Sequence, residues 1–182
     1  TFTIGIETGS YYDDAELNTE MQFMKEKLVS SFIPFLCTFF RDKVGVDVAE
    51  SDCVLMDGSK VGVKFSVHLV VRTNLDHYFI DQLDTWTFAT LFTKYCQKKS
   101  VVDADFKRWY FYTDPKGQTK TTVDHCVNHA STRNMRMLGS CKAKMIPIGQ
   151  NWQKSRVFVL FCGHENKPFT DFIASVYEAP SK

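Results

Sequence analysis

Closely spaced cysteines are missing from this 182-residue chain: it has six cysteines, and no two of them form a C-x-x-C pair. The sequence therefore predicts neither a zinc ribbon nor a small disulfide-stapled fold, and it indicates an intracellular, reducing compartment. Because no run of about 18 apolar residues is present, we expect no membrane span and no membrane partner. The chain starts directly in a strand-like segment, from which we expect no signal peptide and a fragment of a longer protein.

Glycine-rich phosphate loops and dinucleotide-binding fingerprints are also missing, as are internal repeats, low-complexity tracts and clear linkers. These absences argue against P-loop and Rossmann enzymes and favour a single domain over residues 1–182. The composition is 44% hydrophobic and 14% aromatic, which is enough for one well-filled core.

Charge is distributed unevenly along the chain, although the net charge is only +1. Residues 1–60 carry a balance of −6, and residues 61–182 carry a balance of +7. The segment 115–156 holds eight Lys or Arg residues and a single acid, Asp124. Most charged segments are simply solvated, but one this basic is a candidate surface for a polyanion.

Periodic patterns predict helices interleaved with strands. Helices are expected at 18–40, with Pro34 as a kink or break, and at 73–99, with a break near Asp84. Strands are expected at 2–7, 53–56, 61–72, 106–113, 119–123, 136–138 and 156–162, while 169–177 fits either state. Asp57-Gly58 and the segment 114–117 read as turns. The pattern predicts an α+β fold with helices packed on a largely antiparallel sheet.

Three groups of polar residues follow one another along these elements. Glu7 stands at the end of the first strand. On a later strand the side chains of Lys64, Ser66 and His68 alternate with apolar residues, so they are expected on one face. Asp124 then closes the strand at 119–123, and it is followed by four further polar residues: Arg133, Asn134, Arg136 and Lys142.

This order resembles the archaeo-eukaryotic primase superfamily, and within it the catalytic cores of primase-polymerases. In that family one strand ends in Asp-x-Glu, a later strand bears Lys-x-Ser-x-His, and a further Asp precedes an Asn-x-Arg segment that ends in Ser-x-Lys. The matching residues here span positions 2–142, about three-quarters of the chain. The resemblance implies a primase-like core in which helices pack on a largely antiparallel, RRM-like sheet and form a cleft.

The resemblance also implies an activity: template-dependent nucleotidyl transfer from nucleoside triphosphates with Mg²⁺ or Mn²⁺. Glu7 and Asp124 would hold the metal, since these cations prefer carboxylate oxygens, and His68 would be a third catalytic residue. Lys64, Ser66, His68, Arg136 and Lys142 would bind the triphosphate, with Arg133 and Asn134 at the sugar or base.

The implied partners are a single-stranded DNA template and a primer, bound by a monomeric core. The resemblance does not distinguish deoxyribonucleotides from ribonucleotides, or priming from extension. It is equally compatible with a nucleus, a mitochondrion or a viral replication site.

Gly5 departs from the family pattern, because it stands where the first carboxylate of Asp-x-Glu is expected. Loss of one of three anionic ligands should weaken metal binding or turnover. Asp13 or Asp14 could replace it only if the loop after the first strand folds back. Two alternatives therefore stay open: a non-catalytic nucleic-acid-binding module on the same fold, and a plain α+β interaction domain without a nucleotide site.

Overall fold

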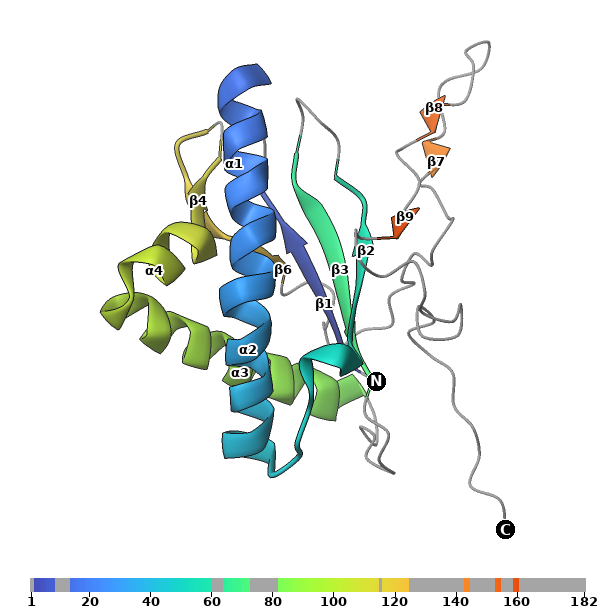
Figure 1. The fold of residues 1–182 in the computed structure, drawn as a ribbon, viewed down its shortest axis with the longest axis vertical. Coiled ribbons are helices and arrows are strands. Elements are labelled where there is room, and N and C mark those ends of the chain that lie inside the picture. The colour runs from blue at the N-terminus through green and yellow to red at the C-terminus, as the bar shows by residue number, and fades with distance from the viewer. Residues whose placement is uncertain are drawn as a thin grey trace.

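The computed structural model of the chain describes residues 2–8, 14–59, 64–72, 82–114 and 116–124, together with three short strands beyond them. In this described part, five strands form a sheet in the order β6-β1-β3-β2-β9 (Figure 1). The strands are β1 (Phe2–Glu7), β2 (Cys53–Asp57), β3 (Ser66–Val71), β6 (Val123–Asp124) and β9 (Val159–Leu160). All four neighbouring pairs are antiparallel, which confirms the predicted α+β class with an antiparallel sheet.

A long helical column runs beside this sheet (Figure 1). It consists of α1 (Asp14–Lys27), a π-helical turn η1 (Leu28–Phe32), α2 (Ile33–Phe39) and a second π turn η2 (Phe40–Val44). The column starts four residues before the predicted Asn18, so Asp14 is a helical residue rather than a loop residue.

Pro34 does not break the column. It lies at the start of α2, and the N–H of Ile33 donates to the Leu28 carbonyl five residues earlier. This wider π turn accommodates a residue that has no N–H of its own to donate. The column ends at Gly45, whose φ of 73° is the left-handed conformation that commonly terminates helices.

The core lies between this column and one face of the sheet. Ile4, Ile6 and Val67 contribute from the sheet, and Leu28 and Phe32 contribute from the helical side; each is at most 1% exposed. Strand residues alternate between faces, so the residues between these apolar positions belong to the opposite face of the sheet. A second helix, α3 (Gln82–Val102), adds Phe88, Phe92 and Cys96 to the same core.

The predicted strand at 106–113 is wrong over most of its length. Ala104–Tyr110 form the helix α4, and only Phe111–Thr113 form a strand, β4. The side chain of Asp103 caps α4 by accepting a hydrogen bond from the N–H of Phe106 at 2.9 Å. Phe106, Trp109 and Tyr110 are all buried, and their i, i+3, i+4 spacing is helical.

The predicted turn at 114–117 is confirmed. It joins β4 to β5 (Thr119–Thr121) in an antiparallel hairpin. One carboxylate oxygen of Asp114 accepts from the N–H groups of both Lys116 and Gln118 at 2.9 Å. A bend at Thr122 separates β5 from β6, so the single strand predicted at 119–123 is divided.

Asp57-Gly58 does not form the expected tight turn, because β3 begins only at Ser66, although β2 and β3 do pair as antiparallel neighbours. A further antiparallel pair joins β7 (Ala143–Lys144) and β8 (Gln153–Lys154). The predicted segments 136–138 and 169–177, and the start of the helix predicted at 73–99, lie outside the described residues.

Candidate functional site

Asp124, Gly5 and His68 form a row across three adjacent strands. Gly5 of β1 pairs with Asp124 of β6 on one side and with His68 of β3 on the other. Residues directly opposite in an antiparallel ladder share a face, with Cβ atoms about 4.5–5.5 Å apart. Because Ile4, Ile6 and Val67 occupy the helix-covered face, this row belongs to the opposite face.

A second row follows one pleat further along, where Glu7 of β1 pairs with Ser66 of β3. The ladder continues beyond it, since the N–H of Thr8 donates to the Phe65 carbonyl at 3.0 Å. Lys64 is half-buried and lies two residues before β3 begins at Ser66, so the strand predicted at 61–72 carries only Ser66 and His68 of the three polar residues. The pairing thus brings Glu7, Ser66, His68 and Asp124 together on one face, although they are far apart in sequence.

The backbone of Ser66 is held by the segment that leaves β2. Its N–H donates to the Ser59 hydroxyl at 3.0 Å, and its carbonyl accepts from the N–H of Gly58 at 2.8 Å. Ser59 is itself held by Asp57, whose carboxylate accepts from the Ser59 N–H at 2.7 Å. Asp57 also forms an ion pair with Lys25 of α1 at 3.0 Å.

Asp57 is buried, and this burial alone would raise the pKa of its carboxyl group. The hydrogen bonds from Ser59 and the ion pair with Lys25 outweigh burial and hold the pKa below its ordinary value. Asp57 is therefore a charged anchor near neutral pH. It links α1 to the β2 end and, through Ser59, to the strand that carries Ser66 and His68.

The two carboxylates predicted to bind a divalent cation belong to Glu7, the last residue of β1, and Asp124, the last residue of β6. Gly5 lies in the row of Asp124, two residues before Glu7 on β1, and supplies no ligand. Among the side chains that the structure describes, no cluster of three or more His, Cys, Asp or Glu residues could hold a metal ion. Carboxylate oxygens are ligands that Mg²⁺ and Mn²⁺ prefer, but this chain has one carboxylate fewer than the predicted family pattern.

The remaining predicted ligands are not tested, since Arg133, Asn134, Arg136 and Lys142 lie outside the described residues. Of the basic segment 115–156, Lys120 is one residue that the structure places. It forms an ion pair with Asp114 at 2.7 Å, which raises the pKa of Lys120 and lowers that of Asp114. This lysine is thus neutralised by an acid just outside the segment.

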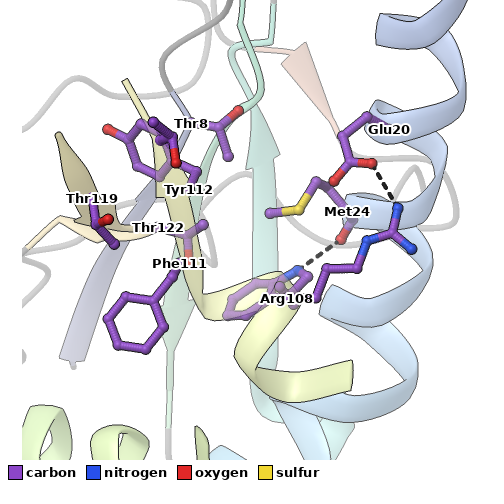
Figure 2. Close-up of a pocket in the computed structure, with 10 residues that line it drawn as sticks. Thr8, Glu20, Met24, Arg108, Phe111, Tyr112, Thr119 and Thr122 are labelled. Carbon is purple, nitrogen blue, oxygen red and sulfur yellow. Dashed lines mark hydrogen bonds and ion pairs between the residues drawn. The ribbon is translucent and has the colours of Figure 1, made fainter. Parts of the chain in front are cut away.

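A cavity that the sequence did not indicate lies between α1, α4 and the β4–β5 hairpin (Figure 2). Its volume is about 370 Å³. Figure 2 shows the hairpin residues and Thr8 on one side, and Met24, Glu20 and Arg108 on the other. Its lining residues come from several elements: Thr8, Glu20, Met24, Arg108, Trp109, Phe111, Tyr112, Thr113, Thr119 and Thr122.

No local sequence pattern predicts this cavity, because three separate segments of the chain build it: residue 8, residues 20–24 and residues 108–122. One wall of the cavity is formed by α4, although the aromatic-rich run at 106–113 predicted a strand there. The four threonines that line it would have been noticed only if the fold were already known.

Comparisons with known proteins leave the family open. No protein-family model matches the sequence, and no curated protein matches it significantly. Within the described residues, none of the helices is both long enough and apolar enough to cross a lipid bilayer.

Proposed function

We propose that this chain is the core of a template-dependent nucleotidyltransferase of the archaeo-eukaryotic primase type, in which an RRM-like sheet carries the active site. The observation that carries the proposal is the strand register. Three separate motif segments meet on one sheet face, because Gly5 is flanked by His68 and Asp124 and because Glu7 pairs with Ser66. A structural role for any one of these polar residues is unremarkable, but four of them gathered on the face away from the core favour a site.

The roles follow from charge and position. Glu7 and Asp124 would hold Mg²⁺ or Mn²⁺, which when bound lowers the barrier to attack on the α-phosphate by a primer 3′-hydroxyl. His68 and Ser66 would donate hydrogen bonds to the triphosphate of the incoming nucleotide, and Lys64 would neutralise part of its charge. Arg136 and Lys142 would add to this binding, while Arg133 and Asn134 would contact sugar or base.

The proposed partners are a single-stranded DNA template and a primer, and the proposed unit is a monomeric core in a reducing intracellular compartment. The basic segment 115–156 supports the choice of a polyanionic partner.

A second function has its own supporting observation. Gly5 occupies the centre of the row where a third carboxylate would complete a two-metal site. A chain that retains template and nucleotide binding but has lost turnover would be a non-catalytic nucleic-acid-binding module on the same fold.

Primer extension in Mn²⁺ on a single-stranded template tests both functions, with Gly5→Asp as the informative variant. An Asp at position 5 would have its Cβ about 5 Å from the Cβ of Asp124, so both carboxylates could reach one divalent cation. Gly5→Asn is the matched control, since it adds the same volume without the charge. Nucleotide binding is measured in parallel for the unmodified chain, both Gly5 variants and Asp124→Asn.

Under the leading proposal Gly5→Asp extends the primer faster than the unmodified chain, and neither Gly5→Asn nor Asp124→Asn does so. If all chains bind nucleotide and template but none extends, the non-catalytic module is the better description. If none binds nucleotide in a metal-dependent manner, the site assignment is wrong.

A further inference from the structure

Two buried thiols lie in contact where the helical column packs on the sheet. Cys37 belongs to α2 and Cys53 is the first residue of β2, and both contribute to the same hydrophobic core. A hydrogen bond joins the two side chains. Between these residues the chain leaves the foot of the column and returns to the start of β2 (Figure 1). The fold thus brings together two thiols that no C-x-x-C spacing predicts.

The two thiols differ in their access to solvent and in their reactivity. Cys37 is 9% exposed, whereas Cys53 is 1% exposed. The hydrogen bond with Cys53 lowers the pKa of the Cys37 thiol. It outweighs burial and the nearby carboxylates of Glu50 and Asp52, which act in the opposite direction. Because the thiolate is the nucleophilic form of cysteine, Cys37 is the member of the pair that reacts first.

The surroundings of Cys37 also select the oxidant. The carboxylates of Glu50 and Asp52 disfavour the approach of an anionic oxidant such as glutathione disulfide. A bulky oxidant would in addition reach the nearly buried Cys37 sulfur only after local opening of the fold. Hydrogen peroxide is uncharged and small, so neither obstacle applies to it.

We propose that Cys37 and Cys53 form a reversible disulfide in response to hydrogen peroxide, and that this bond links α2 to β2. In the first step the Cys37 thiolate attacks one peroxide oxygen. The S–O bond forms, the O–O bond breaks, and the departing hydroxide takes up the proton that Cys37 released, which gives water and a sulfenic acid.

In the second step the Cys53 sulfur attacks the sulfenic sulfur of Cys37. The S–S bond forms and the S–O bond breaks, and the departing oxygen takes the Cys53 proton and leaves as a second water. Two thiols and one peroxide thus give one disulfide and two waters, because two electrons pass from the sulfurs to the peroxide. Dithiol reductants of a reducing compartment would return the pair to thiols by exchange.

The disulfide would close the loop from residue 37 to residue 53 and so restrict the unfolded chain. A loop of this length gives a disulfide a substantial stabilising effect. For a chain of this size we expect the oxidised form to unfold at a thermal midpoint about 5–10 °C above that of the reduced form.

Peroxide oxidation of the folded 182-residue chain tests the proposal, with disulfides located by peptide mapping under non-reducing conditions. We expect a peptide pair joined through Cys37 and Cys53 that dithiothreitol separates. Cys96 is the internal control, since it lies in the same core, is 0% exposed, and has a thiol whose pKa burial raises. It should remain a thiol throughout.

The thermal midpoint is compared between oxidised and reduced protein in a variant that lacks the cysteines outside the described residues. Their replacement by Ser prevents other disulfides from contributing to the shift: Cys126, Cys141 and Cys162. Peptide mapping of the unmodified chain needs no substitution, so the proposal stays testable even where a variant fails to fold.

Single substitutions separate the roles of the two thiols. In Cys53→Ala the reaction should stop at the sulfenic acid of Cys37, which dimedone traps for mass spectrometry. In Cys37→Ala, dimedone should label Cys53 far more slowly. Equal oxidation of Cys37 and Cys96, a Cys37–Cys53 bond that forms only in urea, or a thermal midpoint that oxidation does not raise would each overturn the proposal.

Discussion

Replacement of Asp57 by Asn should destabilise the protein at neutral pH, because this carboxylate joins α1 to the end of β2. Its side chain is 10% exposed, and it pairs with a Lys25 side chain that is 35% exposed. Breaking a well-buried ion pair costs about 3–5 kcal/mol. Lys25 can turn toward solvent and Asn can still accept from the Ser59 N–H, so we expect a smaller loss of about 1–2 kcal/mol.

Asp57→Ala should cost more, about 2–4 kcal/mol, since the buried N–H of Ser59 then has no carboxylate to donate to. The matched control is Asp105→Asn, which breaks another α1 ion pair, Lys27 to Asp105 at 2.8 Å. Asp105 is 72% exposed, so its replacement should change the free energy of unfolding by less than about 0.5 kcal/mol. Urea unfolding measures all three, and a loss of 1 kcal/mol should lower the thermal midpoint by about 2–4 °C.

The stability that Asp57 contributes depends on pH, and the lowered pKa of its carboxyl group determines the direction of this dependence. The folded pKa of Asp57 lies below the ordinary value of 3.8, so its ionised form stabilises the fold at every pH above that value. The stabilising contribution is lost as the pH falls through the lowered folded pKa. The difference between the unmodified protein and Asp57→Asn should therefore be constant from pH 7 to 5 and shrink below about pH 4. Equal losses in Asp57→Asn and Asp105→Asn, or a difference between the unmodified protein and Asp57→Asn that does not shrink as the pH falls below about 4, would refute the reasoning.

Two neighbouring core aromatics should respond in opposite ways. Trp109→Phe removes the indole N–H that donates to the Met24 carbonyl at 3.1 Å and leaves a gap beside Phe32, so it should cost about 2–3 kcal/mol in urea unfolding; Trp86→Phe, at an exposed position of α3, should cost almost nothing. Tyr110→Phe should leave stability unchanged or raise it by up to about 1 kcal/mol, because in the described part of the chain the buried Tyr110 hydroxyl has no hydrogen-bond partner. Burial also raises the pKa of this phenol, so the unmodified protein should show no tyrosinate signal from it in ultraviolet titration up to the onset of alkaline unfolding. A clear loss of stability in Tyr110→Phe would reveal a hydrogen bond that this reasoning lacks.

Local patterns predict the fold well where one face of an element is consistently apolar. The strand at 2–7 and the helical column through Phe39 have regular spacing, so their type follows directly from the sequence. The run at 106–113 misleads because its aromatic residues have high strand propensity, while tertiary burial and the Asp103 cap select a helix. A strand boundary such as Ser66 depends on pairing partners that no local window contains.

The candidate site likewise has one part that the local sequence predicts and another part that only the fold reveals. That Ser66 and His68 alternate on one strand is a local property and was predictable, whereas Lys64 precedes the start of that strand. That His68 and Asp124 flank the same residue of β1 is a matter of register between strands more than 50 residues apart, and it follows only from the fold. The cavity could not be predicted either, since its threonines come from the residue after β1, the hairpin and the bend before β6.

The position of Gly5 explains why binding and turnover need separate assays. Ile4 and Ile6 on either side of it are both 1% exposed and fix β1 against the core, so the backbone at position 5 does not depend on a side chain there. Under the proposed function, the absence of a carboxylate at such a position removes a metal ligand without moving the backbone of β1, β3 or β6. The chain should then keep much of its affinity for a triphosphate and extend slowly, and Gly5→Asp should raise the rate far more than the affinity.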